Sequence, residues 1–372
     1  MRTNPRNPHL SGVLVFLAFI FGVAGLNVLA PTRDVSTQER RTLAQRPALT
    51  VESVIRGDYT EDYASFMQDQ AALRDELRFL KSFVERKLFR KSENNGVYVV
   101  GGRVYDKFYG IKEQLTATVA QRMNEIIAAV PRSKAYLSII PTKAQGLDDD
   151  RFLLSDQHRI ADVLRATVDA TYIDLMDLAS GGAQQRYYGA DPHWTTRGAL
   201  TAYEAIAKAL GLDPIVDYHF EVLSDEYVGS EYGKAAAWSV PLDTIELAHN
   251  DALDAMSACR NETVDRVVCF DSVYVLPDHE TVDLYDVFLG GLAPIIVITN
   301  ERAPSDDELV IFKDSYAHAV APFLAQHYRK VTLVDLRYVQ REYVLDNVDF
   351  DGATTLFLYS TSVINTDPRA MN

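Results

Sequence analysis

The chain has 372 residues, of which 47% are hydrophobic and 24% charged, enough to build one large domain with appendages or two modest domains. Its formal net charge is −15, and no basic stripe is interleaved with aromatic side chains, so the composition argues against a nucleic-acid partner.

An apolar segment opens the chain. Residues 10–30 carry no charged side chain, and as a helix they would just cross the ~30 Å hydrocarbon core of a bilayer. Arg2 and Arg6 precede the segment and favour a cytoplasmic tip at residues 1–9, although the arginines within 33–41 reduce the charge asymmetry. We therefore predict a single transmembrane anchor in the lipid bilayer, with the main domain outside the cytoplasm, either periplasmic or at the cell surface.

A cleaved signal peptide is the alternative for this segment. Its end, at Val28 to Ala30, offers the small residue that a cleavage site needs. Pro31 follows directly, however, and its tertiary amide should make cleavage poor. We favour the uncleaved anchor for this reason.

Residues 31–93 predict a tether followed by a helical stalk. The stretch 31–47 is polar and aperiodic, which suits a tether that leaves the membrane. Further on, apolar residues fall on one helical stripe while charged residues occupy the other positions, so we expect an amphipathic helix that packs on the main domain. The stripe consists of Leu73, Leu77, Leu80, Val84 and Leu88.

Residues 94–372 alternate between strand-like and helix-like patterns. Gly101 and Gly102 separate two short β-rich runs within 96–106, which predicts a hairpin. Later strand-like runs lie at 134–141, 170–178, 294–300, 307–315 and 330–338, and helical spacing lies at 115–126, 160–164 and 199–210. We predict an α/β domain with a central, mainly parallel sheet flanked by helices, and we assign no element within 216–286.

The two cysteines, Cys259 and Cys269, would lie where disulfides persist if the domain is exported. A bridge between them would close a short loop and contribute ~2–3 kcal/mol on the chain-entropy model, and free structural thiols are the alternative. Neither cysteine has a C-x-x-C partner or clustered histidines, so we expect no metal site there.

Two segments carry candidate catalytic residues. Asp191 and His193 lie just ahead of a predicted helix, and Ser315 lies where a predicted strand runs into another helix. Such a serine often only caps its helix, but unpaired N–H groups at that position can also stabilise an oxyanion. Together the two segments favour a Ser-His-Asp hydrolase, with Ser315 as nucleophile, His193 as base and Asp191 holding the imidazole tautomer.

Five further residues are tentative substrate or oxyanion contacts. For these residues the ordinary roles, a solvated lysine, a turn or a core aromatic, stay open. They are Lys143, Trp194, Gly290, Gly291 and Tyr316. A metal site at Asp191 and His193 would need two more ligands that no spacing in the chain suggests, and we expect no cofactor.

Several motifs resemble the DHHW family, which is similar to the SGNH-hydrolase-like domains of bacterial alginate O-acetyltransferases. The motifs are D-x-H-W at 191–194, D-S-Y at 314–316, "FLGG" at 288–291, and the segments "QERRTLAQRPAL", "DQAALRDEL" and "NNGVYV". They are spread along the chain, so the resemblance covers nearly the whole exported part. Pro192 replaces the family's first histidine, and Lys313 stands where GDS-type hydrolases often have glycine. The triad that the resemblance implies is Asp191, His193 and Ser315.

The resemblance also implies a function. We expect a membrane-anchored, extracytoplasmic O-acetyltransferase or acetylesterase that acts on a cell-surface or exported polysaccharide through an acetyl-serine intermediate, with a membrane acyltransferase as a candidate partner. The alternative is a non-catalytic carbohydrate-binding or polysaccharide-assembly protein, because abundant aromatic residues suit sugar stacking as well as a large core. The glycan, the acetyl donor and the choice between transfer and hydrolysis stay open.

Overall fold

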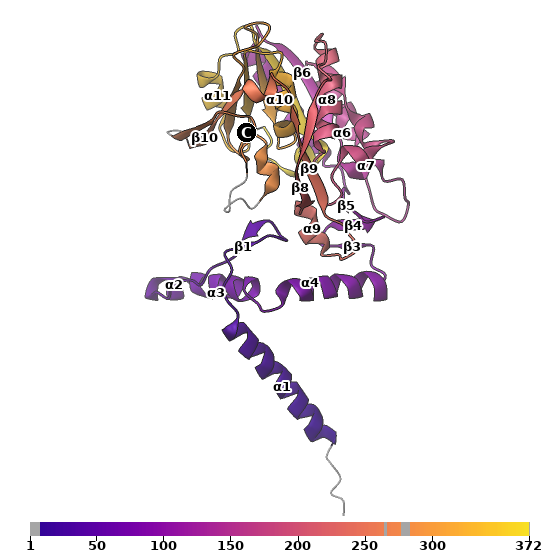
Figure 1. Cartoon of the computed structure of the whole chain (residues 1–372), viewed down its shortest axis with the longest axis vertical. Coiled ribbons are helices and arrows are strands. Elements are labelled where there is room, and N and C mark those ends of the chain that lie inside the picture. The colour runs from indigo at the N-terminus through magenta and orange to yellow at the C-terminus, as the bar shows by residue number, and fades with distance from the viewer. Residues whose placement is uncertain (1–7, 264–265, 277–282, 372) are drawn as a thin grey trace, which may run out of the picture.

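A computed structural model describes residues 8–263, 266–276 and 283–371. Helix α1 (Pro8–Leu29) stands apart at one end, a row of helices follows, and the α/β domain forms the other end (Figure 1). Most of the expected cytoplasmic tip, residues 1–7 with Arg2 and Arg6, lies outside the described residues.

The core of the domain is one eight-stranded sheet. Its strands are, in spatial order, β11 (Arg266–Phe270), β10 (Ser257–Thr263), β12 (Ile295–Thr299), β14 (Lys330–Val334), β13 (Glu308–Lys313), β15 (Thr354–Ser360), β6 (Lys134–Ile140) and β7 (Thr171–Asp174). The five strands from β14 to β7 run parallel, and β12, β10 and β11 continue the sheet antiparallel. The predicted fold class, a mainly parallel sheet with flanking helices, is confirmed.

Helices cover both faces of this sheet. Two separate clusters of buried side chains result: Leu309 and Ile311 of β13 belong to one, while Val310 and Phe312 belong to the other. Alternate side chains of a strand point to opposite faces, so a sheet covered on both sides needs a continuous apolar run. The helices on the first cluster are α8 (Thr196–Ala209) and α10 (Ala317–Ala325), and those on the second are α5 (Glu113–Ala129), α6 (His158–Thr167), α11 (Arg341–Asn347) and α12 (Thr361–Thr366).

The predicted hairpin is present, with β4 (Val97–Val100) and β5 (Arg103–Asp106) paired antiparallel. Both turn glycines have positive φ, 58° at Gly101 and 79° at Gly102, which is the backbone that two-residue hairpin turns require. The unassigned stretch 216–286 contains β10, β11 and a second antiparallel pair. That pair is β8 (His219–Tyr227) and β9 (Asp243–His249), with the short helix α9 (Ser230–Ala235) between its strands.

The stalk consists of α2 (Val51–Arg56), α3 (Asp58–Asp69), α4 (Arg74–Phe83) and the π-helical turn η1 (Val84–Leu88). The expectation that the leucine stripe packs on the domain is wrong. Leu77 and Leu80 are exposed, whereas Phe79 and Ser82 are buried against the domain. A hydrogen bond attaches this side of α4 to the domain: Ser82 Oγ donates to the Ala235 carbonyl at 2.8 Å.

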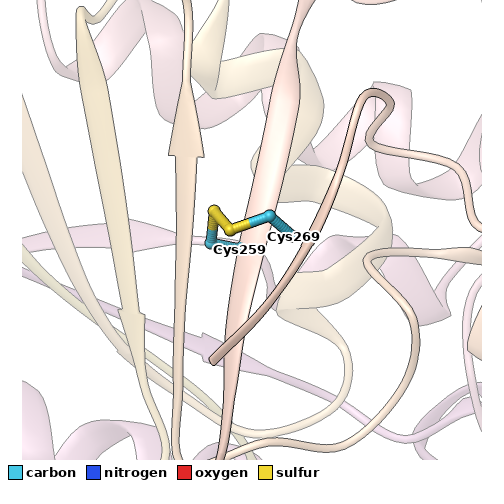
Figure 2. Close-up of a disulfide and its surroundings, with 2 residues drawn as sticks. All are labelled: Cys259 and Cys269. Atoms are coloured by element: carbon cyan, nitrogen blue, oxygen red, sulfur yellow. A yellow bond between two sulfur atoms is a disulfide. The ribbon is translucent and has the colours of Figure 1, made fainter. Parts of the chain in front are cut away.

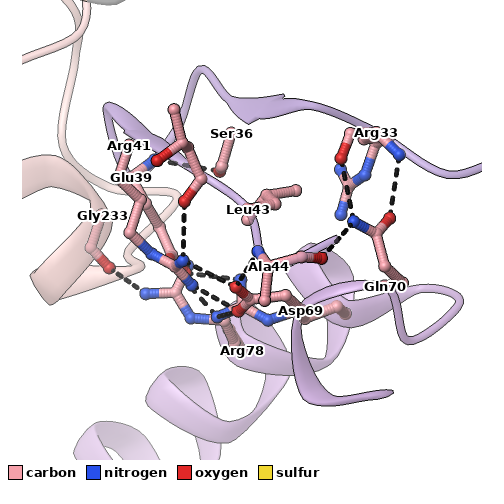
Figure 3. Close-up of polar contacts among 12 residues, drawn as sticks. Arg33, Ser36, Glu39, Arg41, Leu43, Ala44, Asp69, Gln70, Arg78 and Gly233 are labelled. Carbon is pink, nitrogen blue, oxygen red and sulfur yellow. Dashed lines mark hydrogen bonds and ion pairs between the residues drawn. The ribbon is translucent and has the colours of Figure 1, made fainter. Parts of the chain in front are cut away.

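The tether is held in place by polar contacts. β1 (Val35–Ser36) pairs with β2 (Arg41–Thr42). Arg41 forms an ion pair with Asp69 of α3 at 2.5 Å, and Glu39 pairs with Arg74 of α4 at 2.5 Å. Figure 3 shows Glu39, Arg41, Asp69 and Arg78 meeting in one cluster. A segment that looked aperiodic is therefore fixed to the stalk by charge pairs.

A disulfide joins Cys259 of β10 to Cys269 of β11 (Figure 2). The two residues face each other in the strand pairing, with Cα atoms 4.0 Å apart. The bridge therefore fastens the outermost strand of the main sheet to its neighbour.

Candidate active site

Ser315 lies in the turn between β13 and α10. Asp314 fixes this turn, because its Oδ1 accepts from the Tyr316 N–H at 3.1 Å and its Oδ2 accepts from the Ser360 N–H at 2.7 Å. Helix α10 begins without a side-chain cap, so the Ser315 hydroxyl is not used for capping. The Ser315 N–H has no hydrogen-bond acceptor within the described part of the chain.

His193 lies between the two other predicted triad residues. Its Nε2 is 2.7 Å from Ser315 Oγ, and its Nδ1 is 2.6 Å from Asp191 Oδ1. A carboxylate can only accept, so Nδ1 carries the proton and Nε2 faces the hydroxyl as an acceptor. The structure thus brings residues 122 positions apart into one hydrogen-bonded row, the geometry that a serine nucleophile and its base require.

Asp191 is fully buried and surrounded by donors. Besides His193 it accepts from the Ser230 N–H at 2.9 Å and from the Arg40 guanidinium at 2.6 Å. Burial by itself would raise the pKa of Asp191, but His193, then Arg40 and the Ser230 N–H outweigh burial and hold this pKa well below its ordinary value. The carboxylate is therefore ionised at any pH at which the site would work.

Arg40 is a site residue that the sequence analysis treated only as a charge near the membrane. It comes from the tether, has a left-handed backbone with φ of 52°, and leaves only 4% of its side chain exposed. Besides Asp191, the guanidinium donates to Tyr227 Oη at 3.1 Å and forms an ion pair with Asp283. The separation from Asp191 is 151 positions, and no local pattern could have indicated the contact.

Two tyrosines hold the imidazole ring. Tyr285, in the short helix η5 (Leu284–Val287), stacks on His193 with centroids 4.0 Å apart and planes 12° apart. Tyr316 contacts the ring from another side at 4.9 Å, and its hydroxyl donates to the Pro192 carbonyl at 2.5 Å. Trp194 packs edge-on against Tyr316 at 5.3 Å. Trp194 and Tyr316 are thus buried parts of the site's framework, and any contact of theirs with a substrate stays a prediction.

Lys143 is buried beneath the Asp191 loop, so it is not a solvated lysine. Its Nζ donates to the carbonyls of Tyr188 at 3.1 Å and of Asp191 at 2.8 Å, and it pairs with Glu231 at 2.7 Å. These bonds occupy the ammonium, so Lys143 fastens the loop rather than a substrate. Burial raises the pKa of Glu231 to about 7 even though Lys143 opposes the shift.

Gly290 and Gly291 follow η5 in a left-handed turn, with φ of 72° and 84°. A Cβ on Gly291 would approach Asp286 to 2.6 Å, so the turn requires glycine there. Their role as oxyanion or substrate contacts stays a prediction.

Lys313, at the position where many related hydrolases have glycine, points into the protein. Its Nζ is 2.6 Å from His318 Nε2 and 3.6 Å from Asp335. Burial lowers the pKa of Lys313 to about 8, and burial together with Lys313 holds the pKa of His318 well below its ordinary value. His318 therefore belongs to a buried pair behind the nucleophile. Among the described residues, no group of three His, Cys, Asp or Glu side chains could hold a metal ion.

Comparison with known proteins identifies the family. The family model described as DHHW protein matches residues 89–334, which is more than half of the chain. This chain belongs to the DHHW family. No curated protein matches it.

Solved structures share the fold of this DHHW protein. A DHHW family protein from Eubacterium siraeum is 20% identical, with a TM-score of 0.62 over 75% of this chain and 95% of its own. Bacillus cereus PatB1, solved with a sulfonyl adduct, is 19% identical, with a TM-score of 0.60 over 74% of this chain and 99% of its own. The O-acetyltransferase domain of Pseudomonas putida AlgJ is more distant, at 14% identity and a TM-score of 0.47 over 73% of this chain and 93% of its own.

Proposed function

We propose that this DHHW protein is a membrane-anchored, extracytoplasmic O-acetyltransferase or acetylesterase that acts on a polysaccharide through an acetyl-Ser315 intermediate. The observation that carries the proposal is the hydrogen-bonded row of Ser315, His193 and Asp191 at a strand-to-helix turn. The polysaccharide and the acetyl group come from the family's resemblance to alginate O-acetyltransferases.

The geometry supports a two-step mechanism. Ser315 Oγ attacks the acetyl carbonyl of the donor while His193 Nε2 takes the hydroxyl proton, and Asp191 stabilises the imidazolium. The free Ser315 N–H is available to the developing oxyanion. The tetrahedral adduct then expels the donor's leaving group, which receives the proton from His193, and acetyl-Ser315 remains. In the second step His193 deprotonates a sugar hydroxyl or a water, whose oxygen attacks the acetyl carbonyl. The bond from the acetyl group to Ser315 Oγ breaks, and Ser315 Oγ takes the proton back from His193.

The proposed location rests on α1. Ser11–Leu29 is long and apolar enough to cross a membrane and is entirely unburied in the protein. A signal sequence would have the same properties. We favour the anchor because Pro31 opposes cleavage and because α1 is bonded to the stalk, with Asn27 Oδ1 accepting from the Ala72 N–H at 2.8 Å.

Mass spectrometry after exposure to an activated acetyl ester tests the chemistry. We expect one acetyl group on the peptide that contains Ser315 and none in Ser315→Ala, while His318→Gln should still be acetylated. Release by added oligosaccharide would identify a transferase, and release by water alone an esterase. If the wild-type chain gains no acetyl group but binds glycan, the protein is a non-catalytic carbohydrate-binding protein and the proposal is wrong.

A further inference from the structure

The stalk helix α4 exposes its leucines and uses other residues to contact the domain. On the side toward the domain, Arg78 donates to the Gly233 carbonyl at 2.6 Å, Ser82 is bonded to Ala235, and Phe79 packs on Tyr232. Leu77 and Leu80 lie on the opposite side and are 56% and 49% exposed. In a surface helix facing water the charges would lie outside and the leucines inside. The outer face of α4 therefore does not face water alone.

Further apolar side chains are exposed at both ends of the stalk. Helix α2 buries none of its residues. Large exposed side chains flank the α4 leucines at both ends of the stalk: Leu49, Val51, Val54 and Ile55 near α2, and Leu88 and Phe89 at η1. In Figure 1 α2, α3 and α4 form a row between α1 and the α/β domain. An exposed apolar area of this extent marks a contact surface.

The junction with α1 indicates what covers this surface. The segment Ser11–Leu29 has 19 residues and would span about 28 Å as a helix, close to the ~30 Å of a hydrocarbon core. The end of α1 would then lie at the membrane surface. That end is bonded to the start of α4 through Asn27 and Ala72, and Leu26, Leu29 and Leu73 line a hollow between the two helices. Helix α4 therefore starts at the depth of the interface.

The edges of the leucine surface carry the residues that favour an interface. Lys81 and Lys91 both pair with Glu85, at 3.4 and 2.9 Å, and expose more than half of their side chains, at 54% and 56%. Trp238 is 62% exposed and stacks on Phe79 at 5.6 Å. Long basic side chains and tryptophan are enriched where hydrocarbon meets headgroups, and cations attract anionic lipids. The edge thus carries long basic side chains and a tryptophan, although Glu85 neutralises part of the lysine charge.

We propose that helices α2 to α4 lie in the interface of the bilayer, with the α4 leucines at the boundary of the acyl chains. The inference rests on the proposed crossing of the membrane by α1. It makes the stalk a second membrane contact, which holds the α/β domain and Ser315 at a set height above the lipid. A soluble partner is disfavoured because the surface is continuous with the anchor.

The test uses the two tryptophans of the chain, since Trp194 is buried and only Trp238 is exposed. In a Trp238→Phe chain, Leu80→Trp places a probe on the leucine surface. The matched control is Tyr338→Trp, since Tyr338 is 48% exposed and Leu80 49%. Tyr338 precedes α11, which lies at the far end from α1 (Figure 1). The full chain is placed, one copy per nanodisc, in phosphatidylcholine and phosphatidylglycerol with brominated acyl chains.

We expect the probe of Leu80→Trp to lose roughly half of its emission or more, and the Tyr338→Trp probe to lose none. Unquenched, water-like emission at position 80 would overturn the proposal. Unquenched but blue-shifted emission at position 80 would show that another protein covers the leucines, which would overturn the proposal. A chain that does not stay in the nanodisc would overturn both the proposed lipid contact and the proposed anchor. Acetylation of Ser315 is measured on the same samples, so a failure of the proposed chemistry is seen separately.

Discussion

Each charged residue of the site has its partner on a different segment of the chain. Asp191 is bonded to the tether through Arg40 and to the start of α9 through Ser230, and its loop is fastened below by Lys143. Removing one member of such a buried set leaves another charge without a partner, which costs more than the bond itself is worth. The effects of single substitutions should therefore exceed those of surface ion pairs.

Arg40 is expected to act as a positioning residue. Arg40→Ala should lower the rate of Ser315 acetylation about tenfold to a hundredfold, because Asp191 loses one of the bonds that orient it. The rate of Ser315 acetylation by an activated acetyl ester, followed by mass spectrometry, measures the loss.

Two further variants distinguish orientation of Asp191 from attachment of the tether. Arg40→Lys keeps the positive charge and should restore much of the rate. Arg33→Ala removes an ion pair of the same tether, with Asp75 at 2.8 Å, and should leave the rate unchanged. Equal losses in Arg40→Ala and Arg33→Ala would show that Arg40 only fastens the tether.

Glu231 makes stability depend on pH. Its pKa is raised from 4.5 to about 7, so its contribution to stability is fully present below pH 4.5 and is lost as pH rises through 7. Glu231→Gln should flatten this part of the stability profile, which amounts to about 3 kcal/mol. Denaturant unfolding at several pH values measures it, with the exposed Glu226→Gln as control. An identical slope in wild type and Glu231→Gln would contradict the assignment.

At the scale of elements, the central strands and the hairpin follow local patterns that the sequence displays. The continuous apolar run of β13 and the two glycines before β5 are examples. β15 was not predicted although its residues 354–360 are mostly apolar, and it lies between β13 and β6. Short apolar runs do not distinguish a strand from a buried helix, and the neighbours of a strand decide which it becomes.

The disulfide is expected to stabilise the antiparallel edge of the sheet. Replacing both cysteines, Cys259→Ser with Cys269→Ser, should cost ~2–3 kcal/mol and lower the melting temperature without abolishing acetylation of Ser315, because the bridge joins edge strands. Reducing agent should bring the wild type to the melting temperature of the double variant. A wild type that is insensitive to the reductant would contradict the expectation.

At the scale of the whole molecule, the anchor, the stalk and the domain are linked in series by polar contacts. α1 is bonded to α4, the tether to α3 and α4, and the tether to the site through Arg40. Each link holds the next part of the chain, so the orientation of the α/β domain relative to α1 is set by side chains rather than by a free linker.

The chain is expected to behave as an integral membrane protein. It should sediment with membranes, resist extraction by high salt and be released by detergent, because α1 contributes apolar contacts that salt does not weaken. A chain with both Leu77→Glu and Leu80→Glu should still resist extraction by high salt, since its α1 is unchanged. Release of the wild type by salt would contradict both the anchor and the lipid contact of the stalk.

The sequence by itself determined the class of fold, the apolar N-terminal helix, and the three residues of the proposed triad. These follow from short-range regularities: apolar periodicity, turn glycines, and polar residues placed just before helices. Only the tertiary structure decided that the α4 leucines face outward, that Arg40 meets Asp191, and that Tyr285 stacks on His193. A helical stripe shows that one face is apolar but does not say what covers it. Contacts between segments more than a hundred positions apart depend on how the whole chain packs, and no local pattern records them.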